Sequence, residues 1–191
     1  MAVARLSVSE VEVAWLPLTG EVRSARVREL VAAYHASVWK FVRRLGAPPA
    51  VADEVVQEVF VVAFRRVESI REGSERSFLF STAYRTTRDV LKRGRLETAV
   101  EQLDGASDGT PNPEEILDRK RACELAYRLL AELEPDLRAP FVMFEIEEMT
   151  MQEIASAMGL PVPTVGSRLR RAREDFNARI KRHRVRLRGE L

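Results

Sequence analysis

The sequence contains few of the residues with which enzymes and secreted proteins carry out chemistry or form cross-links. Its 191 residues include one cysteine, Cys123, and two histidines, so an internal disulfide is excluded and a cysteine-rich zinc site is not available. His35 lies in an apolar helical pattern and His183 in a basic stretch, neither with a partner at ligand or relay spacing. No glycine-rich phosphate-binding loop occurs. We therefore expect a protein that is not an enzyme and that holds no metal and no cofactor.

Long apolar runs are missing as well. The N-terminal stretch MAVARLSVSEVEVAWLPL has no continuous apolar segment of the kind that signal peptides contain. No part of the chain approaches the roughly eighteen apolar residues of a membrane-spanning helix. We expect a cytoplasmic protein without a membrane span.

Charge of one sign is not in excess overall, but the charges are unevenly distributed. The net charge is +2, from 31 basic and 29 acidic residues, and this gives no global argument for nucleic-acid binding. Residues 131–153 carry seven acidic side chains against Arg138 alone, whereas residues 164–191 carry ten Lys or Arg against three acidic residues. This polarisation predicts a partner that is recognised electrostatically and in one orientation.

Apolar residues at three- and four-residue steps predict an all-α protein made of two small helical bundles. In the first half, this spacing predicts helices over residues 24–45, 50–67 and 75–93. Gly46 with two following prolines would end the first helix, and Gly94 the third. Phe64 belongs to the apolar set of the second helix, and Phe78 of the third is expected to be buried.

The composition changes over residues 95–112, which are rich in glycine, proline and acidic residues and lack apolar periodicity, so we interpret them as a flexible linker. Asn112 would cap a following helix whose first residue is Pro113. A further helix is predicted from about Asp136 to Glu147, with Pro140 tolerated in its first turn. The predicted domains are thus 24–94 and 113–182. Residues 1–23 are left unassigned, and the basic tail 183–191 could bind phosphates or be a disordered, solubilising end.

The second half contains the pattern of a helix-turn-helix. Thr150 and Glu153 have the spacing of a capping box, so a helix begins there. Gly159 would end that helix in the left-handed conformation. Two prolines follow, and Thr164 would then cap a second helix with a buried apolar stripe. This order of helix, short turn and helix predicts a motif whose second helix enters the major groove of DNA.

The exposed side of that second helix is polar and basic, which suits base edges and phosphates. The alternative is an ordinary solvated basic face on a helical hairpin. The predicted duplex-binding residues are Pro163, Thr164, Ser167, Arg168, Arg170 and Arg171.

Two segments resemble a known family. LEPDLRAPFVMFEIEEMTMQEIASAMGLPVPTVGSRLRRARE (133–174) resembles region 4 of bacterial RNA polymerase sigma factors of the extracytoplasmic-function group, and ADEVVQEVFVVAF (52–64) resembles their region 2. The likeness covers roughly residues 24–182 in the family's order. It implies a promoter-specificity subunit whose partners are core RNA polymerase, promoter DNA and an anti-sigma factor, with no small-molecule substrate. The first domain would be region 2 and the second region 4, which would read a minus-35-type element.

The resemblance also implies two roles for the first domain. The face formed by Asp53, Gln57 and Glu58 would bind the polymerase, although the same residues could form a plain solvated face. Segment 70–93 would meet the opened minus-10-type element, because its cations and aromatic rings suit single-stranded bases. Its predicted DNA-binding residues are Arg71, Arg76, Tyr84, Arg85, Arg88 and Lys92.

The sequence departs from the common family pattern at a few positions. Phe78 stands where members often have tryptophan, Tyr84 and Arg85 stand where they have Arg-Asn, and Gly166 replaces a lysine. These departures motivate a second hypothesis, a sigma-like protein that sequesters an anti-sigma factor without supporting transcription. A third hypothesis is a stand-alone helix-turn-helix regulator, which would leave the first half without a purpose.

Overall fold

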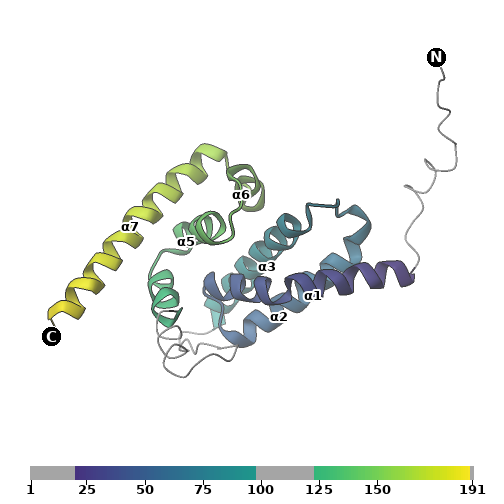
Figure 1. The fold of residues 1–191 in the computed structure, drawn as a ribbon, viewed down its shortest axis with the longest axis horizontal. Helices are drawn as coiled ribbons and strands as arrows, with labels where there is room; N and C mark the ends of the chain where they lie inside the picture. Colours follow the sequence, from purple (N-terminus) through teal and green to yellow (C-terminus); the bar gives the residue numbers. More distant parts are fainter. Residues whose placement is uncertain (1–19, 98–122, 190–191) are drawn as a thin grey trace, which may run out of the picture.

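The computed structural model describes residues 20–97 and 123–189, and every regular element in these ranges is helical (Figure 1). This confirms the predicted all-α class. Residues 1–19, most of the predicted linker, and the predicted cap at Asn112 with Pro113 lie outside the described residues.

The first domain consists of α1 (Gly20–Arg44), α2 (Pro49–Arg66), the single 3-10 turn η2 (Val67–Ser69) and α3 (Glu75–Glu97). The three long helices pack on one another around a fully buried apolar core. At its centre, the rings of Phe41 and Phe80 lie 5.0 Å apart. The main members of this core are Val38, Phe41, Val42, Val55, Val59, Leu79 and Phe80.

Two helix ends of this domain differ from the sequence-based prediction. α1 begins at Gly20, four residues before the expected start, and α3 continues through Gly94 to Glu97. An isolated glycine costs a helix only about 1 kcal/mol relative to alanine, which is too little to end one. The first three residues of the predicted linker are therefore helical.

The second domain contains a helix over 123–131, α5 (Pro135–Phe141), the π-helical turn η3 (Val142–Ile146), α6 (Met151–Met158) and α7 (Val162–Gly189). α7 packs on α5 and α6 through its first half, and its last turns extend away from the other helices (Figure 1). The basic tail is thus helical as far as Gly189.

The expected helix from Asp136 to Glu147 is present, but its last part is a π turn and not a regular α-helical turn. Pro140 is the sixth residue of α5, beyond the first turn, so the predicted reason for its tolerance is wrong. A proline there cannot donate the backbone hydrogen bond of a regular helix. Immediately afterwards the chain adopts the π turn, in which the backbone N–H of Glu147 donates to the carbonyl of Val142 at 3.0 Å. A π turn is wider than an α turn, so it changes the direction of every following side chain.

The two domains pack directly against each other, with α3 on α6. Their apolar residues form one continuous core, to which the first domain contributes Leu45 and Tyr84 and the second contributes Leu130 and Met158. The buried side chain of Arg138 in α5 joins the domains, because its Nη1 donates to the carbonyl of Leu45 at 3.0 Å. Gly46, next to Leu45, has a φ of +100° and lies against this guanidinium.

Replacing Gly46 by alanine tests this junction. Gly46 and Gly73 both have positive φ, so either alanine variant should lose about 1 kcal/mol or more of unfolding free energy. Only at Gly46 would the new methyl group overlap Arg138, whereas nothing lies within 4 Å of it at Gly73. We expect Gly46→Ala to lower the urea midpoint clearly more than the matched control Gly73→Ala; equal losses would contradict the close approach of Arg138.

Candidate nucleic-acid interfaces

The turn between α6 and α7 has the predicted helix-turn-helix geometry. The Thr150 hydroxyl accepts from the backbone N–H of Glu153 at 3.3 Å, and the Glu153 carboxylate accepts from the backbone N–H of Thr150 at 2.8 Å. This second contact is the main reason why the pKa of Glu153 lies below its ordinary value. Gly159 ends α6 in the left-handed conformation, with φ +66°. The capping box and the glycine terminus are therefore both confirmed.

The start of α7 lies three residues before the predicted one. The helix begins at Val162, so Thr164 lies inside its first turn and does not cap it. The carbonyl of Pro161 accepts from the backbone N–H groups of Thr164 at 2.9 Å and Val165 at 3.2 Å. Pro163 is tolerated because N–H groups in a first turn have no partner within the helix. The exposed tip of the motif thus begins at Pro161 and Val162.

One side of α7 is buried and the opposite side is exposed and basic. Val165, Leu169 and Ala172 are buried against α5 and α6. Pro163, Ser167, Arg170 and Arg171 are exposed, and Thr164 is half-buried. The Arg170 side chain is 73% exposed and its one recorded ion pair, with Glu174, is long at 3.7 Å. These side chains form the surface that could enter a groove of DNA.

Arg168 lies apart from this exposed surface. Its side chain is 27% exposed, and its Nη2 lies 3.1 Å from a carboxylate oxygen of Asp136 in α5. The structure thus brings together five of the six predicted duplex-binding residues and directs Arg168 toward its own domain.

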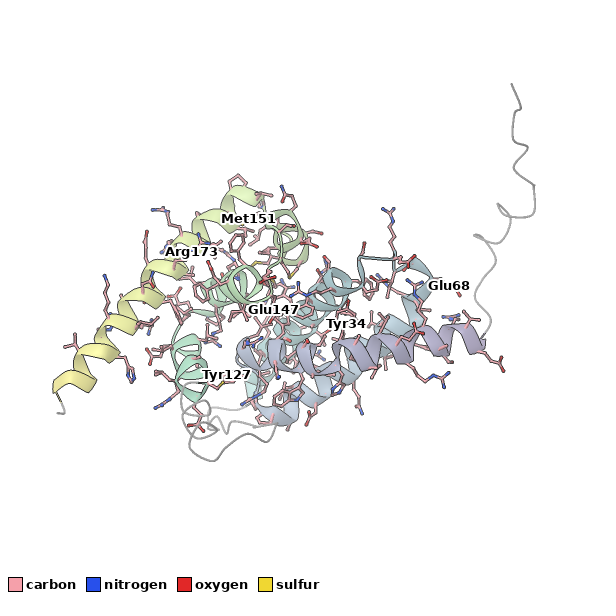
Figure 2. The ribbon with its side chains drawn as sticks, in the orientation of Figure 1. Tyr34, Glu68, Tyr127, Glu147, Met151 and Arg173 are labelled. Atoms are coloured by element: carbon pink, nitrogen blue, oxygen red, sulfur yellow. The ribbon has the colours of Figure 1, made fainter. Side chains whose placement is uncertain are left out.

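Part of the charge polarisation in the sequence is compensated inside the second domain. Three arginines of α7 pair with acids of the preceding segment: Arg168 with Asp136, Arg173 with Glu145 at 2.5 Å, and Arg179 with Glu132 at 2.7 Å. Three of the seven acidic residues in 131–153 are therefore internal partners of α7. Figure 2 shows Arg173 on α7, on the side facing the rest of the domain.

The predicted minus-10 residues of the first domain lie along α3 and the loop before it. Arg71, Arg85, Arg88 and Lys92 are exposed, and Arg76 is half-buried. Tyr84 is only 8% exposed, and burial raises the pKa of its hydroxyl. The guanidinium of Arg88 lies over the Tyr84 ring, 5.9 Å from its centroid. Phe78 is partly buried and packs against the core.

The predicted polymerase-binding residues share the exposed side of α2. Asp53, Gln57 and Glu58 are all exposed. The indole N–H of Trp39 in α1 donates to the Asp53 carboxylate at 2.7 Å, which fixes the direction of that side chain. Helical spacing predicts that Phe64 belongs to the core, but its side chain is 44% exposed.

Comparison with known proteins identifies the family. Residues 30–97 match Sigma-70 region 2, and residues 123–176 match Sigma-70, region 4. The ECF RNA polymerase sigma-E factor of Escherichia coli strain K12 is 30% identical over 162 residues, which cover 79% of this chain and 84% of that protein. The chain belongs to the extracytoplasmic-function (ECF) sigma factors of the sigma-70 family. Such a factor directs transcription initiation by RNA polymerase and is not itself an enzyme.

Other relatives share this sigma factor's sequence or fold. The ECF RNA polymerase sigma factor SigE of Mycolicibacterium smegmatis is 28% identical over 158 residues, or 81% of this chain and 62% of that longer protein. Two solved structures have a similar fold. The sigma factor RpoE of Bartonella quintana, in complex with the anti-sigma factor NepR, gives a TM-score of 0.60 at 20% identity over 81% of this chain and 96% of that one. CnrH, in complex with the cytosolic domain of CnrY, gives 0.57 at 23% identity over 83% and 89%.

Sequence reasoning missed the most buried acidic residue among the described parts of the sigma factor, Glu147. It follows the π turn and is 5% exposed, at the contact between the two domains (Figure 2). Its Oε1 accepts from Arg44 in α1 at 2.7 Å and its Oε2 from Arg76 in α3 at 3.3 Å. Burial raises the pKa of Glu147, although both guanidinium groups act in the opposite direction. No sequence pattern distinguishes Glu147, because it stands in a run of acidic residues and its partners are distant along the chain.

Sequence reasoning also did not predict that two apolar side chains of α2 are exposed. Val61 and Phe64 are exposed, 39% and 44% respectively. Helical spacing places both on the side of Asp53 and Gln57, so the apolar patch continues the predicted polymerase face.

A cavity of about 410 Å³ lies between the domains, lined by residues that include Tyr84, Arg88, Met158 and Arg168. Within residues 20–97 and 123–189, no group of three or more His, Cys, Asp or Glu side chains could hold a metal ion. No helix in the same ranges is long and apolar enough to cross a membrane.

The capping box allows a direct test of the helix-turn-helix. Thr150→Ala removes the hydroxyl that satisfies the Glu153 N–H, so we expect the unfolding free energy to fall by about 1 kcal/mol. Thr150→Ser keeps the hydroxyl and should stay close to the parent. Thermal melts followed by circular dichroism measure both; equal losses in the two variants would show that the hydroxyl is not what stabilises this helix end.

Proposed function

We propose that the second domain reads a minus-35-type duplex element with the exposed side of α7. The observation that carries this proposal is the cationic surface at the start of α7, where Ser167, Arg170 and Arg171 project from a helix held by its capped neighbour α6. Arginine suits guanine edges in the major groove, and serine adapts to several bases. Pro163 and Thr164 lie at the tip of the same surface. Arg168 also belongs to the proposed set. Its side chain would bind a phosphate in place of Asp136 when the helix lies on DNA.

We propose that α3 contacts the opened minus-10-type element. Arg71, Arg85, Arg88 and Lys92 are exposed and would neutralise the strand's phosphates. Arg76 and Tyr84 complete the proposed set, and both are engaged at the interdomain contact in the structure. The Tyr84 ring lies under the Arg88 guanidinium and would be available to a base only after the domains separate.

We propose that core RNA polymerase binds the exposed side of α2 through Asp53, Gln57 and Glu58. Trp39 supports this assignment because its hydrogen bond fixes the direction of Asp53 before a partner arrives. The adjoining Val61 and Phe64 add apolar area of the kind that becomes buried at the centre of an interface.

An anti-sigma factor is the fourth proposed partner. Of the two structural neighbours, RpoE is bound to the anti-sigma factor NepR, and CnrH is bound to the cytosolic domain of CnrY. The shared fold supports an equivalent partner for this sigma factor.

Charge reversals on the two proposed surfaces should separate their roles. The DNA templates for the run-off assay carry promoters that are identified first, by sequencing the transcripts that core enzyme makes with and without the sigma factor. Arg171→Glu should lower run-off transcription about tenfold or more, because a base or phosphate contact to a cation is lost and repulsion replaces it. Binding to core enzyme should be unchanged. The double variant Asp53→Lys/Glu58→Lys should instead lose binding to core enzyme.

Exposed charges outside both surfaces provide the controls. Glu29→Lys on α1 should bind core enzyme normally, and Lys181→Glu near the end of α7 should transcribe better than Arg171→Glu. Identical binding and activity profiles for Arg171→Glu and the α2 double variant would refute the division of roles. Absence of any promoter-dependent product with the parent protein would instead favour a sigma-like protein that captures an anti-sigma factor.

The salt dependence of binding tests the contact made by Arg170. Its side chain is 73% exposed, so replacement by glutamine should leave the fold intact. If the guanidinium neutralises one phosphate, Arg170→Gln should reduce the slope of log affinity against log salt by about 1 for the complex of polymerase, sigma factor and promoter. Fluorescence anisotropy over a salt series measures the slope, and an unchanged slope would place Arg170 away from the phosphates.

A further inference from the structure

The loop that leads from η2 into α3 is short and exposed, and it forms a defined turn. Residues 71–74 are all exposed, and α3 begins directly after them. The backbone N–H of Ser74 donates to the carbonyl of Arg71 at 3.0 Å. Gly73, the third residue of this turn, has a φ of +80°, as a type II turn requires at that position. We call residues 71–74 the α2–α3 loop.

The chain enters this loop from two buried residues. Val67 in η2 is fully buried, and Ile70, directly before the loop, is 3% exposed. The carbonyl groups at the end of a helical segment lack partners within the helix. The backbone N–H of Ile70 reaches the carbonyl of Val67 only at 3.4 Å. These buried carbonyl oxygens therefore need hydrogen-bond donors from another part of the protein.

Arg26 supplies these donors from α1. Its Nη1 donates to the carbonyl of Val67 at 3.1 Å, and its Nη2 donates to the carbonyl of Ile70 at 2.6 Å. Nη2 also lies 3.7 Å from the carboxylate of Glu75, the first residue of α3. Because the guanidinium is a planar fork, it holds its two acceptors in a fixed relation to each other. One side chain of α1 thus contacts the chain on both sides of the α2–α3 loop.

Arg23 makes a related contact one turn earlier on α1, but with a different target. Its Nη2 donates to the carbonyl of Phe64 in α2 at 3.3 Å, and its guanidinium lies 5.4 Å from the centroid of the Phe64 ring. Its Nη1 lies 3.5 Å from the carboxylate of Glu68, which is labelled in Figure 2. Arg23 therefore holds the end of α2, whereas Arg26 holds the two ends of the loop.

The α2–α3 loop adjoins the helix that the proposed function assigns to the opened promoter strand. Arg71 of the loop belongs to the proposed minus-10 set. Attraction between a cation and phosphates does not depend on the base sequence, whereas the reading of one base requires contacting groups that are held in one position. A loop that is fixed at both ends presents its exposed groups in one geometry. The contacts of Arg26 therefore serve base reading more than phosphate binding.

We propose that Arg26 is a positioning residue for promoter reading: it holds the α2–α3 loop in the geometry with which this loop selects one base of the opened minus-10-type strand. The inference rests on the proposed role of segment 70–93. Arg26 acts through the loop and does not itself contact the strand. It restricts the loop before the strand arrives, so less conformational entropy is lost on binding. Loss of Arg26 should reduce discrimination between bases more than it reduces attraction to the strand.

The test measures discrimination between bases, which a purely structural role would leave unchanged. Holoenzyme is assembled from core RNA polymerase and each variant. Anisotropy gives its affinity for fluorescein-labelled single strands that carry the minus-10-type element, with each position changed in turn to every other base. The double variant Arg71→Ala/Glu72→Ala shows which position the loop reads, because it removes the two largest side chains of the loop. Thermal melts followed by circular dichroism report the stability of each variant separately.

At the position that the loop reads, the parent should prefer one base at least about fivefold. Arg26→Gln should reduce this preference below about twofold and leave the preferences at other positions unchanged. Arg26→Lys keeps the charge but lacks the planar fork, so its preference should lie between those of Arg26→Gln and the parent. Arg23→Gln is the matched control, because the two side chains are 31% and 30% exposed on the same helix. It should keep the parent's preference at that position.

Three outcomes would overturn the inference. Unchanged preferences in both Arg26 variants would show that Arg26 contributes to stability alone. An equal loss of preference in Arg23→Gln would show that the contact to the loop is not what matters. Unchanged preferences in Arg71→Ala/Glu72→Ala would show that the loop does not select a base. Failure of the proposed function gives a different result, in which the parent holoenzyme binds the strand no more tightly than core enzyme alone.

Discussion

The buried guanidinium of Arg138 fixes how the two domains meet. It donates to the carbonyl of Leu45 at the end of α1, and to those of Ala131 at 2.5 Å and Leu133 at 2.9 Å at the end of the helix 123–131. Two helix ends whose carbonyls would otherwise need water are thereby joined through one side chain. The position of α5, and of everything that follows it in the chain, is set from this point.

Charge compensation then determines which arginines remain exposed. Three arginines of α7 pair with acids of the preceding segment, so part of the contrast between residues 131–153 and 164–191 is neutralised within the domain. Arg170 and Arg171 remain on the outer side of the helix. The exposed positive charge at the start of α7 is therefore smaller than a count of charges along the sequence suggests.

The sequence predicted those parts of the fold that depend on local spacing. The capping box at Thr150 and Glu153 and the left-handed Gly159 need only neighbouring residues, and both are present as expected. The end of α3 could not be predicted from Gly94. The helix continues to Glu97 because the free energy that one glycine costs a helix is too small to end it. The π turn after Pro140 and the exposure of Phe64 depend on packing between distant segments, as do the partners of Glu147, which are separated from it by up to 103 positions. The candidate surfaces were predicted as sets of residues. The engagement of Arg76 by Glu147 depends on how the domains meet, and the pairing of Arg168 with Asp136 depends on packing inside the second domain.

The π turn at Val142–Ile146 makes the length of this segment as important as its composition. It accommodates one residue more than a regular helical turn would, and each residue of a helix rotates the next by about 100°. Removing a single residue there would turn Glu147 and the entry to the helix-turn-helix through roughly a quarter of a circle. Substitutions within the turn change only a local contact. A one-residue deletion would re-aim everything that follows the turn, including both helices of the helix-turn-helix.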